Sequence, residues 1–219
     1  MKVLLLTAAL LAAVVSNAAV AQQKAPSPLA RQMEQLMTSR LGTTSIDAYP
    51  QFADGKLFAC IIEFNSLVRD NVDRVGTVMK VFGSFGLMAA KGGAAVTLKI
   101  VVHDFDMTTG NASPNAPKNG YFVFGNETSK PSLVAKYPSD VPGALFSVFQ
   151  LDTTFEKLAV GLDADKVTLA FNRRDNSADI TVPLDLRVKS TDENGRKTYS
   201  PEMVIDFYKC GGDLPKSLK

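Results

Sequence analysis

The side chains best suited to catalysis or metal binding lie together in the segment His103-Asp104-Phe105-Asp106. A histidine close to aspartates can transfer protons, and paired aspartates can bind a cation. Because side chains alternate along a strand, a strand here places His103 and Phe105 on one face and Asp104 and Asp106 on the other. A catalytic His–Asp pair would then need a second acid from another strand. We therefore interpret His103, Asp104 and Asp106 as a contact surface for a partner; the alternative is that the aspartates cap a turn.

The same segment begins with the spacing of a calcium-binding loop, Asp104-x-Asp106-x-Thr108. An EF-hand also needs glycine at its sixth position and glutamate at its twelfth, where this chain has Thr109 and Asn115. The chain holds one histidine and two cysteines, so multi-histidine and cysteine-rich zinc sites lack their ligands. The sequence predicts no metal and no cofactor.

Motifs of several enzyme classes are absent from the sequence. There is no G-x-S-x-G motif, and Gly92-Gly93 lacks the lysine and hydroxyl partners of a phosphate-binding loop. Gly83 and Gly86 lack the strand–helix setting of a dinucleotide site, so we interpret these glycines as turn or close-packing residues. No catalytic residue is predicted. A glycosidase pair stays open as an alternative, because its two carboxylates come from different strands.

The charge balance gives no sign of a nucleic-acid partner. The chain has 24 basic and 22 acidic side chains and a formal net charge of +2. The C-terminal third is locally basic at Arg173-Arg174, but ten basic residues face eight acidic ones from Lys166 to Lys219. A nucleic-acid surface requires a larger basic excess.

Residues 1–21 have the form of a secretory signal peptide. Lys2 precedes an apolar run from Val3 to Val15, and Ala19-Val20-Ala21 precedes the expected cleavage site. A membrane span needs about 20 apolar residues, so this run is short for one; an uncleaved anchor is the alternative. We expect a periplasmic or secreted protein with no transmembrane segment after cleavage.

Two cysteines in an exported chain have one intramolecular arrangement. An oxidising compartment lets disulfides persist, so the sequence predicts a Cys60–Cys210 disulfide rather than two free buried thiols. Neither cysteine has the spacing of a catalytic motif.

A helix and a β-rich domain must position these residues. Ser27-Pro28 supplies an N-cap and a first-turn proline, and an apolar stripe from Leu29 to Leu41 predicts a helix over about 28–41 that packs on the main domain. We assign residues 22–55 to a linker with this helix and 56–219 to a single β-rich domain.

Runs of branched and aromatic residues predict the strands. They cover 57–64, 96–103, 121–124, 145–151, 167–172, 179–188 and 199–208. Asn194-Gly195 is a strong hairpin signal, and Asn119-Gly120 and Gly92-Gly93 indicate further turns. This spacing favours an antiparallel β-sandwich or barrel-like domain.

Four segments need separate interpretation. Residues 71–91 fit an amphipathic helix or a strand; we choose a strand because Gly76, Gly83 and Gly86 disfavour a helix. Residues 153–160 have the spacing of a short capped helix. Residues 104–119 and 126–143 are expected as long loops at opposite ends of the sandwich. The first loop has the polar cluster at its root, whereas the second offers Lys130, Lys136 and Asp140.

These observations lead to a class of function. We expect an exported, non-enzymatic binding or structural protein of the cell envelope or extracellular space, with a protein or envelope component as partner. One alternative is a hydrolase of envelope polymers that uses carboxylates from separate strands. Another is a carrier of an apolar ligand in a cavity lined by Phe82 and Phe85.

Overall fold

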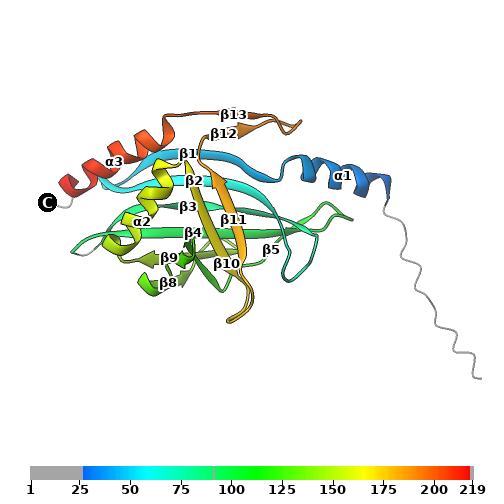
Figure 1. Cartoon of the computed structure of the whole chain (residues 1–219), viewed down its shortest axis with the longest axis horizontal. Coiled ribbons are helices and arrows are strands. Elements are labelled where there is room, and N and C mark those ends of the chain that lie inside the picture. Colours follow the sequence, from blue (N-terminus) through cyan, green and yellow to red (C-terminus); the bar gives the residue numbers. More distant parts are fainter. Residues whose placement is uncertain (1–26, 91, 218–219) are drawn as a thin grey trace, which may run out of the picture.

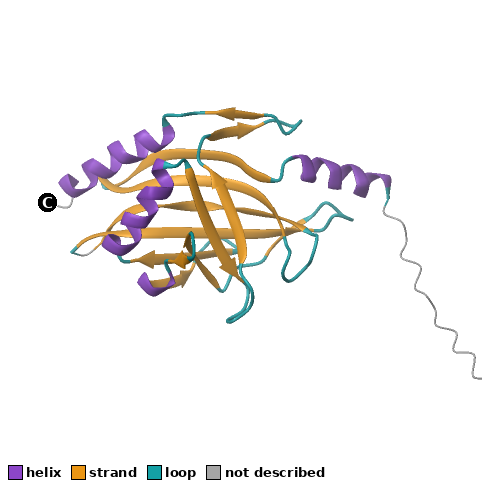
Figure 2. Ribbon diagram, in the orientation of Figure 1, coloured by secondary structure: helices purple, strands orange, loops and turns teal. Residues whose placement is uncertain are grey.

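The computed structural model describes residues 27–90 and 92–217, and within them the chain is mostly β (Figure 2). The predicted signal peptide and its cleavage site lie outside these residues. No helix in the described part of the chain is long and apolar enough to cross a membrane. The sheets are antiparallel, which confirms the predicted fold class of a β-sandwich with an N-terminal helix.

The larger sheet has seven strands within the described residues. Its order is β1 (Gly42–Ala53), β2 (Lys56–Arg69), β3 (Val78–Ala90), β4 (Gly93–Phe105), β9 (Ala144–Phe149) and β8 (Leu133–Pro138), and β5 (Ala112–Pro114) pairs with the end of β4. The first four strands are consecutive in the sequence and adjacent in space. The turn expected at Gly92-Gly93 joins β3 to β4.

The smaller sheet has four strands in the described residues, and a separate hairpin lies beside it in sequence. The sheet order is β11 (Ile180–Asp185), β10 (Lys166–Asn172), β6 (Asn119–Phe124) and β7 (Glu127–Thr128), and the hairpin is β12 (Val188–Thr191) with β13 (Lys197–Tyr199). The hairpin turn contains Asn194-Gly195, as predicted. Asn119-Gly120 begins β6 instead of forming a turn, so that prediction is wrong.

The hydrophobic core lies between the two sheets. The ring of Phe122 on β6 lies 5.8 Å from Phe85 on β3 and 5.6 Å from Phe149 on β9, measured between centroids, in edge-to-face contacts. Strands β10 and β11 cross over the long strands of the larger sheet (Figure 1). The smaller sheet therefore covers the inner face of the larger one.

Three helices lie outside the sheets in the described residues: α1 (Pro28–Ser39), α2 (Leu151–Asp163) and α3 (Met203–Ser217). The first starts as predicted, because the Ser27 hydroxyl accepts a hydrogen bond of 3.1 Å from the Ala30 amide. Helix α2 contains the predicted segment 153–160. A short 3-10 helix, η1 (Lys130–Ser132), precedes β8.

Helix α1 extends away from the sandwich (Figure 1). The side chains of Leu29 and Leu36 are 63% and 40% exposed, so the expected packing of the whole apolar stripe on the main domain is wrong. The end of the helix is held by a hydrogen bond of 2.9 Å from Arg69 to the Thr38 hydroxyl.

Strand β1 lies where the sequence predicted a linker. It pairs with β2 from Gly42 opposite Leu67 to Ala53 opposite Lys56. Threonine, serine, aspartate and proline obscure the β pattern of this strand, and its regular hydrogen bonding comes from β2. The β-rich domain thus includes residues before Lys56.

Helix α3 replaces the strand predicted over 199–208. Val204, Ile205 and Phe207 favoured a strand, but Met203, Val204, Phe207 and Leu214 recur at helical spacing and are buried. The predicted disulfide is present: Cys60 on β2 is bonded to Cys210 on α3, with Cα atoms 5.7 Å apart. The bond therefore joins a strand to a helix, and not two strands as expected.

The segment 71–91 is a strand from Val78 onward, which confirms the choice of strand over helix. Gly83 and Gly86 are required by close backbone approach, as predicted. A Cβ atom at Gly83 would overlap the carbonyl oxygen of Lys99, and one at Gly86 would overlap that of Cys60. The expected loop 126–143 is partly ordered into β7, η1 and β8.

Candidate functional site

The three residues predicted as a contact surface lie in three different environments. His103 lies on the outer face of the larger sheet, where its ring contacts Phe82 edge-on at 5.2 Å between centroids. Asp104 faces inward and is 5% exposed. Asp106 lies in an exposed turn. Strand alternation is confirmed for His103 and Asp104, but the structure does not bring the three side chains together.

Asp106 organises its own turn. Its carboxylate accepts hydrogen bonds of 2.8 Å from the Thr108 amide and the Thr109 hydroxyl, and these contacts lower the pKa of Asp106. Aspartate commonly forms such local hydrogen bonds in turns.

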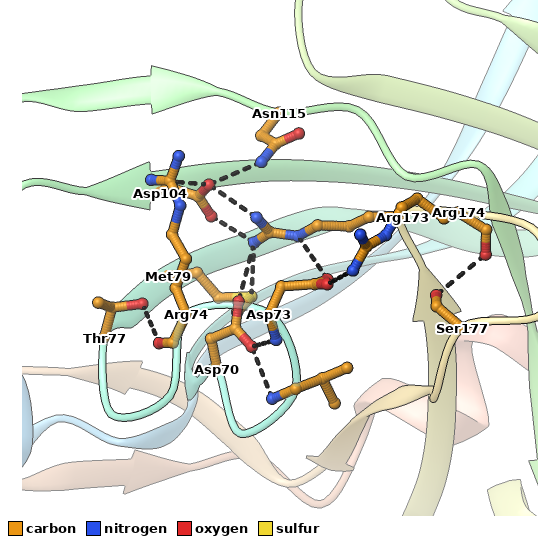
Figure 3. Close-up of polar contacts among 11 residues, drawn as sticks. Asp70, Asp73, Arg74, Thr77, Met79, Asp104, Asn115, Arg173, Arg174 and Ser177 are labelled. Atoms are coloured by element: carbon orange, nitrogen blue, oxygen red, sulfur yellow. Dashed lines mark hydrogen bonds and ion pairs between the residues drawn. The ribbon is translucent and has the colours of Figure 1, made fainter.

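Asp104 belongs to a buried ion cluster built around Arg173. We call Asp70, Asp73, Asp104 and Arg173 the Arg173 cluster (Figure 3). Both oxygens of the Asp104 carboxylate accept hydrogen bonds from the Arg173 guanidinium, with Nη1 2.9 Å from Oδ2. Asp70 lies 3.5 Å from Nη2 of the same guanidinium. The side chain of Arg173 is 8% exposed and that of Asp70 is fully buried.

Three chain segments converge to form this cluster. Asp70 follows β2, Asp104 is close to the end of β4, and Arg173 follows β10. The carboxylate of Asp70 accepts hydrogen bonds of 2.8 Å from the amides of Val72 and Asp73. Burial raises the pKa of Asp70, but these amides and the charge of Arg173 outweigh it and lower the pKa overall.

The charges around the cluster are balanced within the chain. Arg74 lies 3.5 Å from Asp104, Arg174 pairs with Asp73, and Asn115 donates a hydrogen bond of 2.7 Å to Asp104. Each of the three carboxylates therefore has an arginine partner. The cluster ties the two sheets together at one end of the sandwich, which is a structural role.

A different group of polar residues surrounds a pocket of about 380 Å³ beside the same β10–β11 loop. The pocket lies between the smaller sheet and strands β8 and β9. We call it the Tyr121 pocket; its polar lining includes Asn119, Tyr121, Lys130, Lys136, Asn172 and Asp179. Its volume is within the range of pockets that hold small ligands.

Asp179 and Lys130 form a connected pair in this pocket. Nζ of Lys130 lies 3.3 Å from the Asp179 carboxylate and 4.0 Å from the centroid of the Tyr121 ring. Asn172 donates a hydrogen bond of 3.0 Å to Asp179. Burial acts to raise the pKa of Asp179, but Tyr121, Asn172 and Lys130 lower it overall. Asp179 is thus held as a carboxylate.

The Tyr121 hydroxyl is buried beside the Asp179 carboxylate. The residue is 2% exposed. Burial raises the pKa of Tyr121, and so do the hydrogen bond to the Asp179 carboxylate and its charge, so the hydroxyl stays protonated. Tyr121 therefore belongs to the same connected group as Asp179, Lys130 and Asn172.

Lys136 is an exposed residue in the lining of the same pocket. Its Nζ donates hydrogen bonds of 2.6 Å to the Asn119 side-chain oxygen and 3.2 Å to the Lys118 carbonyl. Both acceptors are neutral, and no carboxylate in the described part of the chain forms an ion pair with Lys136.

A second hollow, of about 460 Å³, lies between α2 and strands β6 and β10. Its lining includes the apolar side chains of Phe124, Leu158 and Val167, next to an ion pair between Lys157 and Glu127. Phe82 and Phe85 do not line one cavity, because Phe85 lies in the core and Phe82 is on the outer face with His103.

Comparisons of the chain with protein families, with curated proteins and with solved structures find no match. Among residues 27–90 and 92–217, no group of three or more histidine, cysteine, aspartate or glutamate side chains could hold a metal ion. The functional interpretation therefore depends on the geometry of the site.

The sequence contained part of the signal for the Tyr121 pocket. The sequence places Lys130 and Lys136 in the second loop, but it favours the first loop because His103, Asp104 and Asp106 form a polar cluster at its root. Asn119 and Asn172 are directly opposite in the pairing of β6 with β10. That pairing was not visible from the sequence.

Proposed function

We propose that the protein is an exported, non-enzymatic binding protein of the cell envelope or extracellular space, and that the Tyr121 pocket is its ligand site. The observation that carries the proposal is a pocket of ligand size whose lining brings together Tyr121, Lys130 and Asp179 from three separate parts of the chain. A few convergent polar groups in a pocket of this size are typical of a ligand site. The signal-like segment 1–21 and the Cys60–Cys210 disulfide support export.

The hydrolase alternative receives less support from the acids of the same pocket. A glycosidase acid needs a raised pKa to stay protonated near neutral pH. The pKa of Asp179 is lowered, and its carboxylate is already engaged by Lys130 and Asn172. Asp104, Asp70 and Asp73 are similarly engaged by arginines and do not face this pocket.

The alternative of an apolar carrier rests on the hollow beneath α2. That hollow is larger than the Tyr121 pocket, and its lining includes several apolar side chains beside the Lys157–Glu127 ion pair. It would take a small hydrophobic molecule in contact with Phe124 and Leu158. The two proposals predict ligands at separate positions, so one experiment can distinguish them.

The test is an NMR screen of the chain beginning at Gln22 against polar and apolar small molecules. We expect amide shifts at Gly120, Lys136 and Ser177 with polar compounds. Shifts at Gly161 and Ala164 with apolar compounds would instead support the carrier. If no compound shifts Gly120 or Ser177, the proposed ligand site is wrong. N-terminal sequencing of exported protein tests the compartment, because an N-terminus at Met1 would contradict signal cleavage.

A further inference from the structure

We propose that the outer face of the larger sheet is a dimer interface, on which a second copy of the chain packs face to face about a two-fold axis along β3. The outer face is the side of the strands that is turned away from the smaller sheet. Lys136 of β8 and Ser147 of β9 are paired and line the Tyr121 pocket on the inner side, whereas their neighbours Tyr137 and Phe146 are on the outer face. The inference is therefore independent of the proposed ligand site.

No described element covers the centre of this outer face. Helices α2 and α3 lie on the inner side, where Leu158 of α2 and Phe207 of α3 pack in the same core as Phe85. Helix α1 reaches only one end of the outer face, where Met37 lies near Leu67. In the described part of the chain, the central strands therefore have a covering layer on one side and none on the other.

The uncovered surface carries apolar side chains where a solvated sheet would carry polar ones. In an antiparallel sheet with one face in water, apolar residues point inward and polar residues outward. Here the outward positions include Ile61 on β2, Phe82 on β3, Val101 on β4, and Phe146 and Val148 on β9. Ile61 and Val101 are buried among their neighbours, and the other three are half-buried. An apolar patch on an open face is typical of a protein–protein contact.

The charges at the centre of the outer face lie in one row across the strands. From β1 to β8 this row is Asp47, Glu63, Ser84, Lys99, Phe146 and Tyr137. Its two acids lie on one side of β3, and its lysine lies on the other. The row thus has a negative half and a positive half.

Asp47, Glu63 and Lys99 form no ion pair within the described residues. The carboxylate of Glu63 accepts a hydrogen bond of 2.7 Å from the Tyr49 hydroxyl, a neutral donor. The Ser139 hydroxyl and, more weakly, the charge of Lys99 lower the pKa of Asp140, but Lys99 and Asp140 do not form an ion pair. The row is therefore available for ionic contacts with another molecule.

A two-fold axis along β3 brings the opposite charges of two copies together. The rotation exchanges the two sides of β3, so β2 of one copy faces β4 of the other. Because Glu63 and Lys99 flank Ser84 at the same height, Glu63 of each copy faces Lys99 of the other. Asp47 then faces Phe146, next to the same lysine. An axis across the strands would instead place Glu63 against Glu63. The outer face is thus complementary to itself, and a second copy is the partner that it fits.

The face is also large enough for a stable dimer. Its four longest strands have 12 to 14 residues. They are about 40 Å long at about 3.3 Å per residue, and the six strands span about 24 Å at about 4.8 Å between neighbours. A stable interface buries about 800 Å² on each partner, which this face can provide.

The experiment is sedimentation velocity of the exported protein at concentrations from about 1 to 100 µM, the weaker end of the range for interfaces of this size. We expect a species with the mass of two chains. Glu63→Lys and Lys99→Glu should each weaken the dimer at least about tenfold, because each places like charges opposite one another at two positions.

Two further variants connect the dimer to this pairing. The double variant Glu63→Lys/Lys99→Glu exchanges the two charges and should recover most of the affinity. Glu156→Lys is the control, since it makes the same charge change at an exposed position of α2, on the other side of the larger sheet, and should leave the dimer intact. Circular dichroism checks that each variant is folded.

Three results would overturn the proposal. A monomer at every concentration would mean that no second copy binds the outer face. A dimer that neither single variant weakens would have its interface elsewhere, such as the edge strand β8. If both single variants weaken the dimer and the double variant does not recover it, the pairing of Glu63 with Lys99 is wrong, and so is the axis along β3.

Discussion

The polar side chains on the two sides of the β10–β11 loop differ in how they are paired. On one side, Arg173 is the centre of the Arg173 cluster, where each charged side chain has an ionic partner within the chain. Asn172, the last residue of β10, and Asp179, at the end of the loop, face the Tyr121 pocket, where Lys136 contacts neutral oxygens and has no carboxylate partner among the described residues. The comparison teaches that a buried cluster rich in charge can be entirely structural. Polar groups that line an open pocket are better indicators of a binding site.

The largest expected effect on stability comes from replacing Arg173, at the centre of the cluster. Arg173→Met leaves the buried carboxylates of Asp70 and Asp104 without their main countercharge, which typically costs about 3–5 kcal/mol of the free energy of unfolding. Urea unfolding followed by circular dichroism measures this change. Arg174→Met is the control, because that side chain is 74% exposed and its ion pair contributes at most about 1 kcal/mol. Equal effects of the two variants would contradict the structural role of the cluster.

The next prediction compares Asp104 with Asp106, two aspartates that are two residues apart. Asp104→Asn should lower the free energy of unfolding by about 1–3 kcal/mol, because it weakens hydrogen bonds between buried charged groups. Asp106→Asn should have a smaller effect, since the turn of Asp106 is exposed. Thermal unfolding of both variants measures the difference. A double variant that stays folded but loses a partner in pull-down would restore His103, Asp104 and Asp106 as a contact surface.

The Arg173 cluster should also determine part of the loss of folding stability at low pH. The pKa of Asp70 is lower in the folded state than in the unfolded state, where it is about 3.9. Its stabilisation is therefore complete above about pH 4 and is lost as the pH falls through the lower, folded pKa. We expect Asp70→Asn to show a shallower decrease in stability below about pH 4 than the wild type. Urea midpoints measured across this range test the slope, and parallel curves for the two proteins would exclude the contribution of Asp70.

The smallest expected effect on stability comes from the pocket. Tyr121→Phe removes a buried hydroxyl beside the Asp179 carboxylate and retains the aromatic ring. Because Asp179 keeps its contacts with Lys130 and Asn172, the free energy of unfolding should decrease by only about 0.5–1.5 kcal/mol. Thermal unfolding without ligand measures this. A decrease of more than about 3 kcal/mol would contradict this prediction, because it exceeds what one hydrogen bond to a charged group contributes.

Much of the fold was accessible from the sequence because local signals determine it. Branched and aromatic runs predicted β2, β4, β6, β9 and β10, and two cysteines in an expected export pathway allowed one disulfide. Strand β1 was missed because its hydrogen bonding depends on β2 and not on its own composition. Helix α3 was misread because Val204 and Ile205 favour strands locally, whereas its buried face has helical spacing.

The sites were harder to predict, because their contacts join distant parts of the chain. Arg173 is 69 residues from Asp104, and Lys130 is 49 residues from Asp179. The sequence showed that Asp104 and His103 alternate but not that an arginine lies opposite Asp104. It showed two lysines in the second loop but not the asparagines that hold Lys136 near the pocket.

The disulfide between β2 and α3 also sets an order of events during synthesis. Cys60 precedes Cys210 by 150 residues. At about 5–20 residues per second, the ribosome adds Cys210 roughly 8–30 s after Cys60. During that interval the thiol of Cys60 has no native partner, although β3 to β11 are already available for pairing. Oxidation of this pair therefore reports that the chain has been made as far as α3.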